Sequence, residues 1–184
     1  MLEEKLKEWF GFSSFNPGQK EIIESVVSKK DTLGILPTGS GKSLCYQMPT
    51  YMKGKPTLII SPLISLMDDQ VMQLKAQGEK FVTSIHSGMD ENEKQQNINS
   101  LHKSRFVFLS PEFILQTQNF KLIRNIDFGL IVLDEAHCLS EWGYDFRPHY
   151  ALIGEITSHY KNASILALTC LLYTSPSPRD RTRS

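Results

Sequence analysis

The sequence predicts an α/β protein in three layers, with a mainly parallel β-sheet covered by helices on both faces. Short apolar runs alternate along the chain with stretches of helical spacing, which is typical of repeated β-α units. Several runs are apolar throughout instead of alternating with polar residues, and this indicates strands that are buried on both faces. The six runs are residues 32–36, 57–60, 81–85, 106–109, 130–133 and 165–168.

The stretches around these runs predict the helices. Apolar residues recur at helical spacing among charges in residues 2–10, so the chain opens with a short amphipathic helix. Pro17 can occupy the first turn of a second helix. Asp90, followed three residues later by Glu93, resembles a capping box at the start of another. The remaining expected helices are residues 42–52, 63–76, 90–102, 111–116 and 150–160.

The composition excludes several classes of protein. The 184 residues, 40% of them hydrophobic, suffice for one domain with a core. Twenty Lys and Arg residues balance twenty Asp and Glu residues, which excludes a generally basic nucleic-acid binder but not a locally basic groove. Three cysteines without a CxxC pair predict neither a disulfide framework nor a zinc site. We expect a soluble intracellular monomer without a membrane span, cytoplasmic or, in a eukaryote, nuclear.

Residues 36–43, with the sequence LPTGSGKS, follow one expected strand and precede an expected helix. The glycines let the backbone curl so that its N–H groups point inward, and the helix N-terminus attracts anions. Such a loop can hold a triphosphate, with Lys42 reaching the β- and γ-phosphates and Ser43 binding Mg²⁺. The alternative is a glycine-rich turn with a solvated lysine. The expected nucleotide contacts in this loop are Thr38, Gly39, Ser40, Gly41, Lys42 and Ser43.

The apolar run at residues 130–133 ends in two acidic residues, Asp134 and Glu135. In a parallel sheet this end lies beside the phosphate loop. We expect Asp134 to hold Mg²⁺, and Glu135 to orient and deprotonate the attacking water, with Lys42 as the third catalytic residue. Alone, such a pair more often begins a helix, but its place about 90 residues after a phosphate loop favours catalysis. His137 either couples this site to the rest of the protein or only packs.

The TGSGKS loop together with Asp-Glu-Ala-His at residues 134–137 resembles superfamily 2 helicases, and other segments resemble the RecQ family among them. Residues 15–23, FNPGQKEII, look like the adenine-reading motif of that family, in which Gln19 would hydrogen-bond the adenine edge. An arginine that stacks on the base is common in the family where this chain has Asn16. The resemblance spans residues 10–169 and keeps the family's order of motifs.

Three further segments resemble RecQ motifs that line the DNA groove. Residues 61–70 and 110–112 offer hydroxyl and backbone N–H groups that grip phosphates without reading bases. Residues 140–148, SEWGYDFRP, resemble the aromatic-rich loop of the family, in which Trp142 and Phe146 would stack on unpaired bases. The alternative is that both aromatics are core residues of an irregular turn. The residues expected to contact DNA are Ser61, Pro62, Leu63, Ser110, Trp142, Phe146 and Arg147.

The resemblance implies the first RecA-like domain of an ATP-dependent 3′-to-5′ DNA helicase of recombination and repair, at residues 1–169. ATP and Mg²⁺ would be its cofactors, and single-stranded or partially duplex DNA its partner. Residues 167–169 look like the start of a motif that the family continues with Ala-Thr, whereas this chain continues with Cys170. We therefore expect residues 170–184 to be a non-native or disordered tail rich in Ser, Pro and Arg.

On this interpretation the second RecA-like domain, with the arginines that stabilise the transition state, is missing. The chain alone should then bind Mg·ATP weakly, hydrolyse it poorly and not unwind DNA. Two alternatives are a fragment of a DEAH-box RNA helicase and a nucleotide- or nucleic-acid-binding module without catalysis. A third, a transporter ATPase subunit, lacks the expected Leu-Ser-Gly-Gly-Gln-like segment. Gln19 and residues 142–148 favour the RecQ-like hypothesis.

Overall fold

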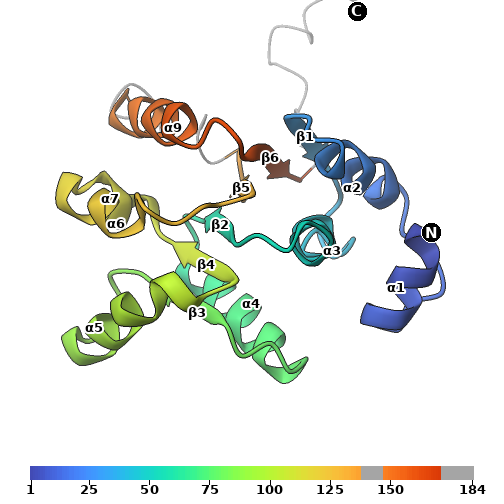
Figure 1. The fold of residues 1–184 in the computed structure, drawn as a ribbon, viewed down its shortest axis with the longest axis horizontal. Helices are drawn as coiled ribbons and strands as arrows, with labels where there is room; N and C mark the ends of the chain where they lie inside the picture. The colour runs from blue at the N-terminus through green and yellow to red at the C-terminus, as the bar shows by residue number, and fades with distance from the viewer. Residues whose placement is uncertain (138–146, 171–184) are drawn as a thin grey trace, which may run out of the picture.

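The computed structural model describes residues 1–137 and 147–170, and within them six parallel strands form one sheet (Figure 1). The order of the strands is β1-β6-β5-β2-β4-β3, and every neighbouring pair is parallel. The predicted sheet is confirmed, and each strand begins and ends within one residue of its apolar run. The strands are β1 (Thr32–Ile35), β2 (Thr57–Ile60), β3 (Val82–Ile85), β4 (Phe106–Leu109), β5 (Leu130–Leu133) and β6 (Ser164–Thr169).

The helices cover both faces of this sheet, so the predicted three layers are confirmed. The described helices are α1 (Leu2–Phe10), α2 (Gln19–Val27), α3 (Leu44–Lys53), α4 (Ile64–Ala76), α5 (Glu91–Ser100), the 3₁₀ helix η1 (Leu101–Lys103), α6 (Pro111–Leu115), α7 (Thr117–Ile123) and α9 (Arg147–His159). Helices α2, α3 and α4 pack on one face, whereas α6, α7 and α9 pack on the other (Figure 1). In the described ranges, no helix is both long enough and apolar enough to cross a membrane.

The central strand β2 shows why the apolar runs do not alternate. All four of its residues are buried. Ile59 packs in the cluster beneath α2, α3 and α4, whereas Leu58 and Ile60 pack in the cluster beneath α6, α7 and α9. Because successive side chains point to opposite faces, a strand covered on both sides buries every residue, and most of them are apolar. The one polar residue of β2, Thr57, is buried with its hydroxyl 2.6 Å from that of Thr50.

Helix α7 is the element that the sequence analysis missed, because one helix was expected at residues 111–116. Gln116 has extended backbone angles, with φ −73° and ψ 110°, and this separates α6 from a second helix. Phe120 and Ile123 anchor α7 in the core, but two apolar residues three positions apart are too short a pattern to predict a helix. The capping bond at α5 was foreseen, since the Glu93 N–H donates to Asp90 Oδ1 at 2.8 Å.

Candidate nucleotide-binding site

The predicted phosphate loop and the acidic pair meet at the carboxyl edge of the sheet. The loop follows β1 and the pair follows β5, with β6 lying between these two strands. Lys42 Nζ donates a hydrogen bond to Glu135 Oε1 at 2.8 Å, although 93 residues separate the two in sequence. The parallel order of the strands therefore brings the three predicted catalytic residues, Lys42, Asp134 and Glu135, to one place.

A cavity of about 350 Å³ opens between this loop, the acidic pair and helix α4. Tyr46, Leu66, Gln70 and Gln73 line it without having been predicted, because they carry no nucleotide motif and reach the site only through the packing of α3 and α4. Tyr46 Oη donates to Gln70 Oε1 at 2.9 Å, which joins the two helices. The predicted residues that line the cavity are Thr38, Gly39, Gly41, Lys42, Ser43, Asp134 and Glu135.

The two glycines of the loop meet different constraints. Both have left-handed backbone angles, with φ 78° at Gly39 and 79° at Gly41, and residues other than glycine rarely adopt such angles. A Cβ atom at Gly41 would also lie 2.6 Å from Gln19 Nε2, whereas one at Gly39 would meet nothing within 4 Å. Gly41 is thus required both by conformation and by space, and Gly39 by conformation alone.

Gln19 lies against the backbone of the phosphate loop, with only 3% of it exposed. Its Nε2 donates to the carbonyl oxygens of Ser40 at 3.0 Å and Gly41 at 2.9 Å. Its Oε1 accepts from the Asn16 N–H at 2.8 Å, and Asn16 Nδ2 donates to the Ser40 carbonyl at 3.0 Å. The side chain predicted to read adenine therefore holds the loop in shape here, and its contact with adenine stays a prediction.

The backbone at Glu135 is strained, because its φ of 51° lies in the left-handed region, at a cost of about 1–3 kcal/mol for a residue other than glycine. Its Oε2 lies 3.3 Å from His137 Nδ1, while Oε1 binds Lys42. The next residue, Ala136, donates its N–H to the Leu168 carbonyl of β6 at 2.8 Å. Pairing with β6 thus fixes the turn that carries the Glu135 carboxylate over the sheet edge.

The chemistry of Asp134 and Ser43 fits a divalent cation. Burial raises the pKa of the Asp134 carboxyl above its ordinary value, and the neighbouring Glu135 charge raises it further, against the opposing effect of Lys42. A cation beside this carboxyl would offset the cost of ionising it. Ser43 stands at the N-cap of α3 without making a side-chain capping bond, so its hydroxyl oxygen can serve as a ligand.

Several of the residues predicted to contact DNA are buried or lie outside the described residues, unlike the predicted nucleotide contacts, most of which line the cavity. Ser61 is 1% exposed and Ser110 is fully buried, and Ser110 Oγ accepts from the Phe113 N–H to cap α6. Pro62 is half-buried and Leu63 is exposed. The remaining candidates are at the edge of the described residues or beyond them: Arg147 is the first residue of α9, and Trp142 and Phe146 lie outside the described residues. The DNA contacts stay predictions.

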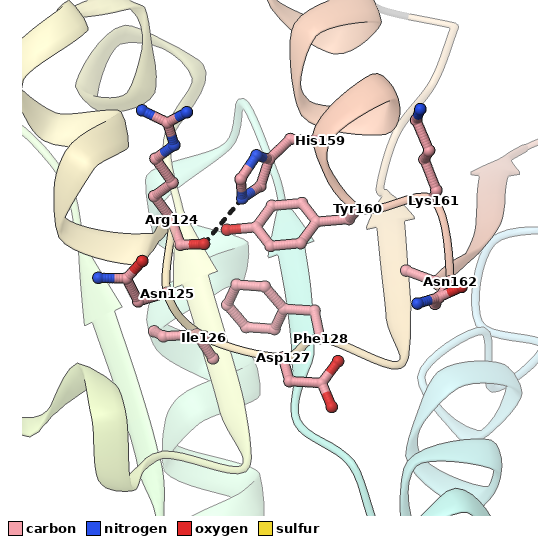
Figure 2. Close-up of a pocket in the computed structure, with 10 residues that line it drawn as sticks. Arg124, Asn125, Ile126, Asp127, Phe128, His159, Tyr160, Lys161 and Asn162 are labelled. Atoms are coloured by element: carbon pink, nitrogen blue, oxygen red, sulfur yellow. Dashed lines mark hydrogen bonds between the residues drawn. The ribbon is translucent and has the colours of Figure 1, made fainter.

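A second cavity, of about 400 Å³, lies at the opposite edge of the sheet, where β5 and β6 begin (Figure 2). His159 Nε2 lies 2.8 Å from the carbonyl oxygen of Arg124, and Tyr160 Oη donates to the Ile123 carbonyl. These bonds tie the ends of α7 and α9 together. The cavity lies between the segments that follow α7 and α9, and none of the residues predicted for the site lines it.

Comparison with known proteins points to one family. The family model described as DEAD/DEAH box helicase matches residues 16–175, past the domain boundary expected at residue 169. The chain is 47% identical over 168 residues to the probable ATP-dependent DNA helicase RecS of Bacillus subtilis, covering 91% of this chain and 34% of that protein. It is 44% identical over 162 residues to the ATP-dependent DNA helicase RecQ of Pasteurella multocida, covering 87% and 26%.

The chain therefore spans about a third or less of the length of these relatives. A solved structure of a hypothetical ATP-dependent RNA helicase from Sulfolobus tokodaii superposes with a TM-score of 0.71 at 23% identity. That match covers 91% of this chain and 49% of the other, and it supports the fold alone.

Removing the Gln19 side chain should loosen the phosphate loop. Gln19→Ala leaves the Gly41 carbonyl without a side-chain donor and the Ser40 carbonyl with Asn16 Nδ2 alone, so we expect a loss of about 1–3 kcal/mol in the free energy of unfolding. Asn16→Ala is the matched control, since it removes one exposed bond to the same loop. Urea unfolding without nucleotide measures both. An equal loss in the two variants would contradict the role assigned to Gln19.

The raised pKa of Asp134 predicts a pH dependence of stability. Above the pKa of the unfolded chain, ionising this carboxyl in the folded state costs free energy, and the cost disappears as pH falls through the folded pKa. At neutral pH with a chelator, Asp134→Asn should therefore be more stable than the unaltered chain, and the difference should shrink on acidification. Thermal unfolding between neutral pH and about pH 4, the ordinary Asp range, measures this. A difference that is constant with pH would refute it.

Proposed function

The chain belongs to the DEAD/DEAH box helicase family, and on that premise we propose that it is the ATP-binding domain of a RecQ-like 3′-to-5′ DNA helicase. The observation that carries the proposal is the ion pair of Lys42 with Glu135. Both residues line a cavity that is also bordered by the rest of the phosphate loop and by Asp134. Similarity to RecS and RecQ supports DNA as the polymer. Membership of the DEAD/DEAH box helicase family supports ATP as the nucleotide that is hydrolysed.

Lys42 has two competing partners in this proposal. In the structure its ammonium group is neutralised by Glu135 at 2.8 Å. The oxygens of a triphosphate carry more charge than one carboxylate, and the loop N–H groups bind the same phosphates, so Lys42 exchanges Glu135 for the nucleotide. Released from Lys42, the Glu135 carboxylate can accept a proton from the attacking water.

Ser43 and Asp134 would hold Mg²⁺ beside the phosphates. Both supply oxygen atoms, which this cation prefers, and both line the cavity. When bound, the ion neutralises negative charge that develops on the phosphate oxygens. The raised pKa of Asp134 supports this assignment, because the carboxyl gains a counter-charge that Lys42 alone does not supply.

Two further parts of the proposal rest on the resemblance to RecQ enzymes. Full hydrolysis and unwinding would need arginines from a second RecA-like domain, which lies outside residues 1–169. DNA would bind through residues 61–63, Ser110 and the segment from Trp142 to Arg147. The family model matches through residue 175, so Cys170, which directly follows β6, is included in the proposed domain.

Two substitutions separate binding from hydrolysis. Lys42→Ala should weaken binding of Mg·ATP by about tenfold or more, since a charge-assisted hydrogen bond contributes about 1.5–3 kcal/mol. Glu135→Gln should keep binding but lower hydrolysis by about 10²–10⁴. The measurements are fluorescence anisotropy with a labelled ATP analogue, and phosphate release with single-stranded DNA or RNA of equal length.

Lys20→Ala is the matched control, because Lys20 is an exposed lysine paired with Glu3 away from the cavity. Lys20→Ala should change neither the binding of Mg·ATP nor the rate of its hydrolysis. Binding of Mg·ATP that is unaffected by Lys42→Ala would refute the nucleotide site. Stimulation by RNA but not by DNA would refute the RecQ-like assignment and favour an RNA helicase.

A further inference from the structure

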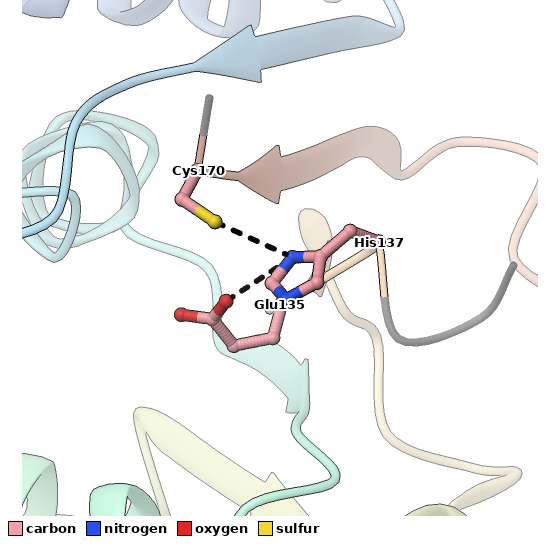
Figure 3. A group of neighbouring side chains, drawn as sticks. All are labelled: Glu135, His137 and Cys170. Carbon is pink, nitrogen blue, oxygen red and sulfur yellow. Dashed lines mark hydrogen bonds and ion pairs between the residues drawn. The ribbon is translucent and has the colours of Figure 1, made fainter. Parts of the chain in front are cut away.

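Three side chains that can bind a transition metal meet beside the nucleotide site, above the carboxyl end of β6. They are Glu135, His137 and Cys170, as Figure 3 shows. Glu135 Oε2 lies 3.3 Å from His137 Nδ1, and this nitrogen lies 3.9 Å from Cys170 Sγ. All three ligand atoms lie within 4.8 Å of one another. The cluster forms because β5 and β6 are parallel neighbours, so the residues that follow them meet.

Two of these distances are close to the edges of a tetrahedral zinc site. Zinc bonds of about 2.0–2.1 Å to nitrogen, 2.0–2.2 Å to oxygen and 2.3 Å to sulfur place neighbouring ligands about 3.3 Å apart for N and O, and about 3.6 Å for N and S. The observed separations are 3.3 Å and 3.9 Å. The third edge, between the ligand atoms of Glu135 and Cys170, is at most 4.8 Å here and about 3.6 Å in a tetrahedral site. A metal ion could thus reach all three atoms after side-chain movements of up to about 1 Å.

We propose that Glu135, His137 and Cys170 form a binding site for Zn²⁺, distinct from the Mg²⁺ position assigned to Ser43 and Asp134. A carboxylate, an imidazole and a thiolate together suit zinc, whereas Mg²⁺ takes oxygen ligands and does not compete for the sulfur. Three protein ligands leave the fourth tetrahedral position to water.

The surrounding atoms can accommodate the change that metal binding requires. Cys170 releases its thiol proton to solvent, and His137 binds the ion through an unprotonated Nδ1. Thr169 Oγ1, now 3.0 Å from that nitrogen, also lies 3.3 Å from the Cys170 carbonyl and can donate its hydrogen there instead. Glu135 uses Oε2 for the metal and keeps Oε1 on Lys42.

Cys170 is the thiol in the described residues that can serve this site. Cys45 is fully buried, and burial raises its pKa to about 12, so it stays protonated and away from solvent. Cys138 lies outside the described residues, and it is therefore the thiol against which Cys170 must be tested. The pattern of cysteines predicted no zinc site, because a site with one cysteine depends on the strand order.

Metal binding here has a consequence for hydrolysis, and this part alone rests on the proposed function. Once nucleotide has drawn Lys42 away from Oε1, the ion would still hold Oε2 of Glu135. A carboxylate bound to a metal cation is a weaker base, so it would accept a proton from the attacking water less readily. Zn²⁺ should therefore inhibit ATP hydrolysis even in excess Mg²⁺.

Cobalt is the probe, because Co²⁺ takes the ligands and geometry of Zn²⁺ and gives an absorption band when bound to thiolate. Titrating Co²⁺ into the metal-free chain in excess Mg²⁺ should produce this charge-transfer band at one equivalent, and Zn²⁺ should remove it. The band should vanish in Cys170→Ser and persist in Cys138→Ser. His137→Ala should weaken Co²⁺ binding by at least tenfold, because loss of even an outer-shell partner costs about 10–100-fold.

Circular dichroism of each variant confirms that it folds. A wild-type chain without the band, or a band that survives Cys170→Ser, would overturn the site, as would loss of the band in a folded Cys138→Ser variant. Hydrolysis is measured separately in the unaltered chain and in Cys170→Ser. A cobalt band without inhibition by Zn²⁺ supports the metal site and counts against Glu135 as the base in the proposed function.

Discussion

The ion pair between Lys42 and Glu135 is the constraint on which the rest of the site depends. It joins the segments after β1 and β5, which are not neighbours, since β6 lies between them. Both side chains are largely buried, at 16% and 13% exposure, so the pair is less screened than one on the surface. Separating the two leaves charges without a partner unless another anion reaches Lys42. A triphosphate in the cavity can meet that requirement.

The neighbouring residues hold this arrangement before any ligand binds. Gln19 binds the carbonyl groups of the loop, and Gly41, which has no Cβ atom, leaves room for the Gln19 amide beside it. Pairing of Ala136 with β6 holds Glu135 in its strained backbone conformation. A site whose shape is set in advance loses less entropy on binding. The same pairing brings His137 to the end of β6, where Cys170 meets it, so the proposed zinc site follows from the geometry of the nucleotide site.

The sequence predicted those features that leave a pattern within a short stretch of chain, and not those that depend on contacts between distant segments. Apolar runs located all six strands. In β2, β3 and β4 every residue is buried, which leaves a continuous pattern, whereas β1 at the sheet edge is apolar although Leu33 and Ile35 are exposed. Lys42 and the acidic pair were found because their spacing is tied to the phosphate loop. The orientation of Gln19, the lining role of Tyr46 and the burial of Ser61 were not predictable, because each depends on how distant segments pack. The meeting of His137 and Cys170 likewise required the strand order, which no local pattern contains.

When nucleotide binds, Lys42 should exchange Glu135 for a phosphate. A crystal structure with Mg²⁺ and a non-hydrolysable ATP analogue tests it through the distance from Lys42 Nζ to Glu135 Oε1, which is 2.8 Å here. We predict that this distance exceeds hydrogen-bonding range and that Nζ contacts a phosphate oxygen. An intact Lys42–Glu135 pair beside a bound nucleotide, or a nucleotide bound away from this cavity, would contradict the account.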